Sequence, residues 1–494
     1  MKSGDWGVPV STAELPRLNR LLSDTSVSVA FAVGFAGLSA LFYVVFTPTS
    51  AVAYAGFVAA ICVLLWEWVG RRLLSGRATF VLVMILTGFY GITLGDIPIG
   101  GFSVFPYRIL LGVALLGATG IWLANGASIR VSRHPLRWYY GFLAAWFLYG
   151  AVSLVWSTAP AASIHELLVL GLALILVVLC AESLSTASGV RHFKWLWIAM
   201  LAVFLVVGIL ENQLGLHIRT KIMEMPTLAA LYRPRGPFHN TNDFATLLAL
   251  SMPFAMVLMA RGRRSSGYVL GGVLFGAGIY MIRLTGSRAG MASVLLETVV
   301  FVLFIVRRKA RWRFVGTMAV LACMVATFAP GYLAGILASL QSIAVQLSRG
   351  VGSAATRLGL VRSSLSALIS SYGLGVGAGN IQPWIAARGG AGSGVSSVHN
   401  WWLEILGSYG ILVFAGYVAF YLGLIRALVR ARRTALTDWE RRLSEGLIVS
   451  LVGFSLASIG PSSIMALRAH WLLFAFALAF VYHARRSRQG FPAP

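Results

Sequence analysis

Charged residues are scarce in this sequence. Asp, Glu, Lys and Arg make up 11% of its 494 residues, whereas hydrophobic residues make up 58%. Soluble domains carry about 25% charged residues, so this composition argues against an ordinary water-soluble globular protein. Acidic residues are the scarcest, with 15 Asp and Glu against 40 Lys and Arg and a formal net charge of +25.

Cysteine is also rare. Cys62, Cys180 and Cys323 lie far apart, each inside a separate apolar segment, so we expect neither a disulfide nor a metal site. A cleavable signal peptide is not expected either. Residues 1–24 are polar with mixed charge, and the first apolar segment, 27–46, is too long for the apolar region of a signal peptide.

The sequence contains long hydrophobic runs. Fourteen apolar segments of roughly 16–22 residues alternate with short polar connections, and about 20 apolar residues suffice for one helical crossing of a bilayer. Their centres lie near residues 37, 60, 87, 115, 147, 173, 203, 250, 275, 299, 322, 412, 453 and 476. We therefore expect an all-α polytopic membrane protein with about 14 transmembrane helices, eleven within 27–330 and three within 401–483.

The basic residues divide into two populations. Alternate connections and the two termini hold 28 of the 40, nearly all of them arginine. Under the positive-inside rule this side is cytoplasmic, so both tails, 1–26 and 484–494, are expected there. These basic residues are expected to fix the orientation of the protein in the membrane and to contact anionic membrane lipids. The excess of positive charge therefore does not indicate a nucleic-acid partner.

The other twelve basic residues fall at the outer ends of helices or in outer loops, against the positive-inside rule. They are Arg108, Arg219, Lys221, Arg233, Arg235, Arg283, Arg288, Arg349, Arg357, Arg362, Arg388 and Arg468. Charged groups near membrane depth are costly and usually face a cavity or a partner. The pattern predicts an anionic ligand that approaches from outside.

Two outer connections are long enough to be functional. Residues 212–240 begin with alternating apolar and basic residues that fit a helix lying in the membrane interface. Residues 331–400 contain two stretches of helical period, roughly 334–348 and 353–371, followed by a glycine-rich tract at 373–379. A loop of this length usually forms a lid or a binding subdomain.

The glycine-rich tract is not a nucleotide-binding loop. It lacks the Gly-Lys-Ser/Thr ending of a P-loop and the strand that precedes a Rossmann turn. We interpret it as a tight turn whose backbone amides can approach a phosphate or a sugar.

Two arginines stand where an anion could bind. Arg235 lies just before a helix expected to begin near Thr241, and a helix N-terminus directs free amides at an anion. The alternative is an arginine that snorkels to lipid headgroups. Arg288 lies in a turn of small residues between two apolar helices, where a ligand can come close. Arg283, one turn earlier, is expected to play a supporting part.

His399 is the candidate for proton transfer. It precedes Asn400 and the helix that follows the glycine tract, and an imidazole exchanges a proton near neutral pH. Taken alone, a histidine at an interface is more often structural. The outer carboxylates form no close pair and no Asp-x-Asp motif, which argues against paired-carboxylate hydrolysis and divalent-metal transfer. Asp96 is a minor candidate base.

The order of these motifs resembles the O-antigen ligase and O-antigen polymerase superfamily. Arg-x-x-Gly-x-x-x-Asn-x-Asn spans 233–242, Ser-Arg-x-Gly spans 287–290, and a long outer loop ends in Gly-x-Gly-x-Gly and His-Asn before a Glu-x-x-x-x-x-Gly helix. The motifs cover residues 230–410. The first 200 residues match only in helix pattern and in an outer Trp-Ser turn at 156–157.

The resemblance implies a membrane glycosyltransferase with a fold like that of the C-type class. Its expected donor is an undecaprenyl-diphosphate-linked glycan, its acceptor a glycan or lipid-linked hydroxyl, and its reaction inverting and independent of metal or other cofactor. Arg235 and Arg288 match the diphosphate arginines, with Arg233 as an alternative to Arg235, and His399 matches the catalytic histidine. Expected supporting residues are Asn240, Asn242, Arg283, Arg357, Asn400 and Asp96.

The same resemblance implies a bacterial cytoplasmic (inner) membrane protein whose active site faces the periplasm or the cell exterior. The sequence does not separate a ligase from a polymerase, which differ in the acceptor. A transporter or flippase of lipid-linked glycans is the alternative class, but it predicts inward-facing charged cavities and repeat symmetry.

Overall fold

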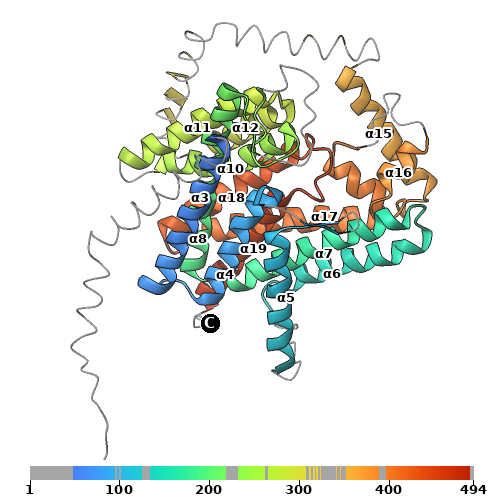
Figure 1. The fold of residues 1–494 in the computed structure, drawn as a ribbon, viewed down its shortest axis with the longest axis horizontal. Coiled ribbons are helices and arrows are strands. Elements are labelled where there is room, and N and C mark those ends of the chain that lie inside the picture. Colours follow the sequence, from blue (N-terminus) through green and yellow to red (C-terminus); the bar gives the residue numbers. More distant parts are fainter. Residues whose placement is uncertain are drawn as a thin grey trace, which may run out of the picture.

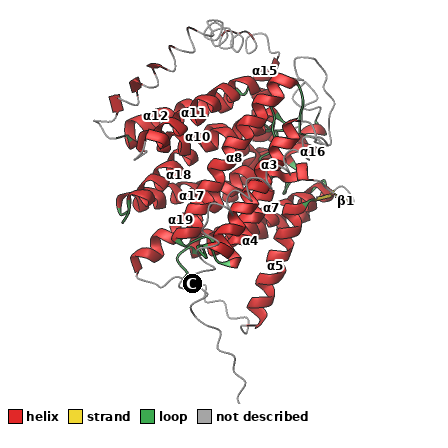
Figure 2. Ribbon diagram, turned by 60° about the vertical axis from the view of Figure 1, so that its left-hand side comes forward, coloured by secondary structure: helices red, strands yellow, loops and turns green. Residues whose placement is uncertain are grey.

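The computed structural model describes residues 48–94, 97–99, 102–124, 134–218, 232–261, 265–306, 352–388 and 397–489, with isolated positions between 311 and 345. Apart from one short hairpin, the regular elements in these ranges are helices (Figures 1 and 2). Nine of the described helical segments are long and apolar enough to cross a membrane. The predicted all-α polytopic class is therefore confirmed.

The elements follow in this order: α3 (Pro48–Leu65), a π-helical turn (Trp66–Gly70), α4 (Gly76–Tyr90), a 3-10 turn (Gly91–Leu94), β1 (Ile97–Ile99), β2 (Phe102–Val104), α5 (Pro106–Ala124), α6 (Arg137–Val152), a 3-10 turn (Ser153–Trp156), α7 (Pro160–Ser183), α8 (Ala187–Leu214), α10 (Thr241–Arg261), α11 (Ser265–Thr285), α12 (Arg288–Val300), a π-helical turn (Phe301–Ile305), α15 (Gly352–Ser370), α16 (Ile381–Ala386), α17 (Trp401–Arg433), α18 (Asp438–Ala457) and α19 (Arg468–Gln489). The two strands pair antiparallel, with Ile97 opposite Val104.

Twelve of the fourteen predicted segments coincide with helices. Those centred near 37 and 322 lie outside the described residues, as does the tail 1–26. Nine of the twelve match the helices that pass as membrane spans; the other three are α5, α18 and α19. The termini of α18 and α19 carry arginine and acidic or histidine residues, which lowers their mean hydropathy although much of each helix is buried.

Helix α19 lies at the centre of the bundle. It contacts α4, α7, α8, α10, α17 and α18, and its residues from Leu472 to Val481 are almost completely buried. A helix that is apolar all round belongs inside a protein, so its position follows from its sequence. Helices α10, α11 and α12 group on one side of the bundle in both overall views (Figures 1 and 2), and α10 and α12 pack on α18.

The antiparallel course of the helices gives the bundle two ends. We call one the site end; it holds the loop 232–240, the α11–α12 junction at 286–288, residues 397–400 before α17, and the turn 458–461 after α18. We call the other the arginine end; it holds residues 134–138 before α6 and the C-terminal turns of α17 and α19.

The long outer loop 331–400 contributes two described helices, α15 and α16, which pack against α17. Helix α15 confirms the helix expected over 353–371, whereas the stretch 334–348 lies almost wholly outside the described residues. In the earlier loop, the expected interface helix falls mostly on residues 219–231, which are also outside. There the chain leaves α8 through Gly215, whose left-handed conformation ends the helix.

Candidate functional site

Gly460 joins three segments of the site end. A Cβ atom at Gly460 would lie 3.4 Å from the Ala289 side chain and 3.6 Å from the Asn242 side chain. Its carbonyl oxygen lies 3.3 Å from Nδ1 of His399. The turn after α18 thus brings the first residues of α10 and α12 next to the residue that precedes α17.

The geometry of His399 defines its chemistry. Its φ of 51° is left-handed, a conformation that costs a non-glycine residue roughly 1 kcal/mol and clusters at functional sites. Because the Gly460 carbonyl can only accept, Nδ1 carries the proton of their hydrogen bond and the neutral ring keeps its lone pair on Nε2. The imidazole is therefore arranged to accept a proton at Nε2.

The charge around His399 favours this neutral form. Burial, the main cause, and the positive charge of Arg357 hold the pKa of His399 below its ordinary value, while hydrogen bonds with the backbone of Gly460 and Pro461 oppose this shift. His399 therefore remains neutral at pH 7.

Arg357 supplies positive charge near His399, and Arg288 lies near Arg357. Arg288 is the first residue of α12 and is exposed, next to the Ser287 cap that accepts from the Gly290 amide. Arg357 is half-buried in α15. Burial and the nearby charge of Arg288 lower the pKa of Arg357, so the two guanidinium groups lie within electrostatic reach of each other. Two arginines that repel each other at one place suit a polyanionic ligand.

The structure separates Arg235 from Arg233. The Arg235 side chain is buried, whereas Arg233 is exposed. Within the described part of the chain, the Nε and Nη2 atoms of Arg235 have no hydrogen-bond partner, and burial lowers the pKa of this arginine while Glu211 opposes the shift. Of the two, Arg235 is the desolvated guanidinium that would gain most from an anion.

Glu211 holds this loop in place, a role that the sequence did not reveal. Its Oε2 atom accepts hydrogen bonds from the backbone amides of Arg235 and Gly236, at 2.9 and 2.8 Å, and its Oε1 atom lies 3.3 Å from Nδ1 of His217. The carboxylate thus fixes the backbone. Gly236 has a φ of 51°, and a Cβ there would press on the ring of Phe244.

Asparagines at the site end act mainly as helix caps. The Asn240 side chain accepts from the Asn242 amide at 2.8 Å at the start of α10, and the Asn400 side chain accepts from the Trp402 amide at 3.0 Å at the start of α17. Both bonds satisfy amides that a helix leaves unpaired. The Asn242 side chain also lies against Gly460 in the turn after α18.

Two expected supporting residues remain, Arg283 and Asp96. The Arg283 carbonyl accepts from the Gly286 amide at 3.0 Å in the α11–α12 turn, and its side chain is half-buried. Asp96 lies outside the described residues. The structure therefore gathers Arg288, Arg357, His399 and Asn242, and places Arg235 in the loop that leads into α10.

The glycine tract differs from the expectation of free amides. The amides of Val376 and Gly377 donate to the carbonyls of Gly407 and Ser408 in α17, at 2.9 and 3.0 Å, and the Ala378 amide donates to the Ser153 hydroxyl at 2.9 Å. These three amides are therefore bonded within the protein and are not available to a ligand. They find partners there because the tract packs where α17 is broken, at Gly410.

Asn380 ties the end of this tract to the outer turn between α6 and α7. Its Nδ2 donates to the Ser157 hydroxyl at 2.9 Å, and its Oδ1 accepts from the Ala159 amide at 2.8 Å. Trp156 donates from its indole to the Gly375 carbonyl at 3.0 Å. The Trp-Ser turn noted in the sequence is therefore a support for the glycine tract.

Glu166 and Glu404, which are far apart in the sequence, lie close enough in the structure to interact. Tyr409 lies 3.3 Å from an oxygen of Glu166 in α7, and Glu404 acts on Glu166 electrostatically. Glu404 also accepts from the Ser463 hydroxyl at 2.7 Å, so it braces the segment before α19. Among the described residues, no group of three or more Asp, Glu, His or Cys could hold a metal ion.

A comparison with known proteins relates the chain to a family. Residues 273–418 match the family model described as O-antigen ligase. The match runs from α11 into α17 and includes Arg288, Arg357 and His399, but it begins after the loop that carries Arg235.

A similar curated protein is the teichuronic acid biosynthesis protein TuaE of Bacillus subtilis (strain 168). It is 28% identical over 421 residues, which cover 83% of this chain and 85% of TuaE. The two comparisons support a role for this membrane protein in joining glycans, as a polymerase or a ligase. Both comparisons support the family expected from the motifs, that of the O-antigen ligases and polymerases.

Proposed function

We propose that this protein is a glycosyltransferase that moves a glycan from an undecaprenyl-diphosphate donor to an acceptor hydroxyl at the outer face of the bacterial cytoplasmic membrane. The observation that carries the proposal is the cluster at the site end, where His399 binds the Gly460 carbonyl through Nδ1, the positive charge of Arg357 acts on His399, and Arg288 in turn acts on Arg357. A base beside fixed positive charge is what transfer from a diphosphate leaving group requires.

The arginines act on the donor. As the bond between the anomeric carbon and the diphosphate oxygen breaks, the leaving oxygen takes the electron pair and negative charge grows on the diphosphate. Arg288 and Arg235 hold that diphosphate, with Arg357 adding to the field. Guanidinium groups fixed in a partly desolvated site stabilise such charge more than water does, and here they take the place of a metal ion.

His399 acts on the acceptor. The acceptor hydroxyl oxygen attacks the anomeric carbon on the face opposite the diphosphate, and its proton passes to Nε2 of His399. The Gly460 carbonyl holds Nδ1–H, so it orients the ring and stabilises the imidazolium that forms. Attack from the opposite face inverts the anomeric configuration.

Both comparisons favour a transferase over the transporter alternative, because both relate the chain to proteins named for glycan joining or glycan synthesis. TuaE is named for teichuronic acid biosynthesis, so the class of product that we propose is a bacterial envelope polysaccharide. Polymerase and ligase share the chemistry above and differ in the acceptor alone.

The test is transfer by purified protein. The full chain in lipid nanodiscs is incubated with an undecaprenyl-diphosphate-linked glycan, first alone and then with a fixed glycan acceptor, and products are followed by mass spectrometry. Chain growth without added acceptor identifies a polymerase; transfer to the fixed acceptor identifies a ligase. Both release undecaprenyl diphosphate, and we expect EDTA to leave the rate unchanged.

Matched variants test the assigned residues. We expect Arg288→Ala and Arg235→Ala to lower the rate by at least about 100-fold, and His399→Ala by about 100- to 10,000-fold. The exposed neighbour Arg233→Ala should stay within about twofold of wild type. Full activity of the Arg288→Ala or His399→Ala protein would refute the site, and movement of intact donor between leaflets without product would indicate the transporter.

A further inference from the structure

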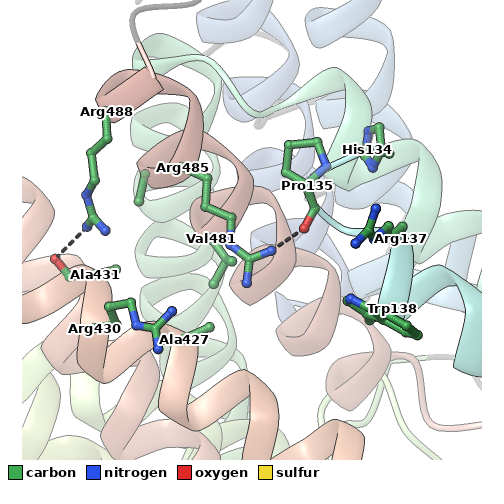
Figure 3. A pocket seen from close by; sticks show the side chains of 11 residues that line it. His134, Pro135, Arg137, Trp138, Ala427, Arg430, Ala431, Val481, Arg485 and Arg488 are labelled. Carbon is green, nitrogen blue, oxygen red and sulfur yellow. Dashed lines mark hydrogen bonds between the residues drawn. The ribbon is translucent and has the colours of Figure 1, made fainter. Parts of the chain in front are cut away.

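A cavity of about 470 Å³ opens at the arginine end, away from the site just described. Three helix ends form it: the start of α6, the last turns of α17 and the last turns of α19 (Figure 3). Its charged and aromatic lining residues are His134, Arg137, Trp138, Arg430, Arg485 and Arg488. This volume is that of a small-molecule site.

Four arginines and no carboxylate line the cavity. Arg430 and Arg485 both repel Arg488 electrostatically, so positive charge is concentrated in one place. Figure 3 shows Arg430 of α17 and Arg485 of α19 reaching into the space between their helices. Arginines that serve only topology need no shared cavity, since they need only lie on the correct side of the membrane.

The nearest acids are already engaged. Glu440 attracts Arg488, but one of its oxygens lies 3.0 Å from Nε2 of His483 and the other accepts from the Leu436 and Thr437 amides at the start of α18. Glu182 lies 3.2 Å from His134 and accepts from the Tyr140 hydroxyl at 2.6 Å. The cavity therefore keeps an excess of positive charge.

Backbone carbonyls fix the position of two of the four arginines. Arg485 donates to the carbonyl of Pro135, and Arg488 donates to the carbonyl of Ala431 at 3.3 Å (Figure 3). Each guanidinium keeps further N–H donors. The α6 N-terminus at Leu136, which has no side-chain cap, adds its dipole to the same side of the cavity.

The rim indicates where the ligand comes from. Trp138 is 78% exposed at the start of α6, and the Arg137 guanidinium lies 5.3 Å from the centre of its ring. Exposed tryptophan beside arginine is typical of the level of lipid headgroups. The walls also include the apolar side chains of Ala427 and Val481, which suit the glycerol and upper acyl region of a lipid.

We propose that this cavity binds the phosphate headgroup of an anionic phospholipid, with Arg137, Arg430, Arg485 and Arg488 as its phosphate ligands. Phosphate is recognised by convergent guanidinium groups, and basic pockets between helices at the cytoplasmic side of a membrane are lipid headgroup sites. The bound lipid would hold the ends of α6, α17 and α19 together at the face opposite the transfer site.

Native mass spectrometry of the detergent-purified full chain tests the proposal. The protein is titrated with phosphatidylglycerol, with phosphatidylcholine and with inorganic phosphate. The test variant is Arg137→Gln/Arg430→Gln, two exposed side chains of the cavity. Its matched control is Arg426→Gln/Arg433→Gln, which removes the same charge from exposed positions of α17 that do not line the cavity.

We expect wild type to retain phosphatidylglycerol at least about tenfold better than phosphatidylcholine, the test variant to lose that preference, and the control to keep it. Equal loss in both variants would overturn the proposal, because it would show a response to surface charge alone. Retention of inorganic phosphate without the lipid would overturn the lipid assignment. Thermal unfolding of each variant in detergent shows whether it is folded.

Discussion

The positive charge of Arg357 near His399 predicts how pH affects the reaction. His399 must be neutral to accept a proton, and burial together with Arg357 keeps its pKa below the ordinary value. Activity should therefore persist below pH 6.5 and fall as the pH drops through the lowered pKa. In Arg357→Gln one cause of the lowering is gone, so the pKa of His399 rises and the acid limb moves to higher pH.

The measurement is kcat against pH for wild type, Arg357→Gln and Arg362→Gln. Arg362 is an exposed residue of the same helix, and we expect its variant to keep the wild-type profile. A uniform loss of rate in Arg357→Gln, with the acid limb unmoved, would mean that Arg357 acts on the donor alone.

Single residues show what the sequence could and could not specify. Arg288 and His399 could be selected as candidates from the sequence, because one lies in a turn of small residues and the other just before a helix start, and the structure places both at the site end. Asn240 and Asn400 were not resolved by sequence, since a helix cap and a ligand-binding residue both favour Asn before a helix. The role of Glu211 depends on amides 24 and 25 residues away, a contact that only the fold creates.

Helix α17 shows how one element positions the site. Gly410 interrupts it with a φ of 75°, and a Cβ there would collide with the carbonyl of Gly373. At the break the Ile411 amide donates to the Gly373 carbonyl, and the carbonyls of Gly407 and Ser408 accept from the glycine tract. That contact anchors the chain just after α15, which carries Arg357.

Gly410→Ala should therefore destabilise the protein. A left-handed backbone costs a non-glycine residue about 1–3 kcal/mol, and the collision with Gly373 adds to this. We expect a clear fall in the midpoint of thermal unfolding, followed by scanning calorimetry in detergent, with reduced transfer activity. Gly423→Ala, in a regular part of the same helix where the nearest atom to a new Cβ is 3.9 Å away, should be neutral or stabilising. Equal midpoints for the two variants would contradict the role given to the break.

Elements of the bundle were predictable to different degrees. Apolar length located the helices, because about 20 apolar residues have few alternatives to a membrane crossing. Periodicity also located α15 within the long loop. The break in α17 was not predictable, since a glycine inside an apolar helix has the same local signature whether or not another segment packs on it.

The whole molecule has two chemically different ends. The site end holds Arg288 and His399, and the arginine end holds the cavity of Arg430 and Arg485. Because the helices connecting them are long enough to cross a bilayer, the proposed transfer site and the proposed lipid site lie on opposite sides of the membrane. The positive-inside rule predicts that the arginine end is the cytoplasmic one.

Labelling of single cysteines tests this orientation. In a background with Cys62, Cys180 and Cys323 replaced by alanine, Ile369→Cys places a thiol in α15 at the site end and Leu436→Cys places one at the arginine end, at positions 76% and 69% exposed. A membrane-impermeant maleimide should label Ile369→Cys in intact spheroplasts and Leu436→Cys only after permeabilisation, because the reagent reaches the outer face alone. The reverse pattern would put the arginine end outside. It would also place the site end in the cytoplasm, where the proposed outer acceptor could not reach His399.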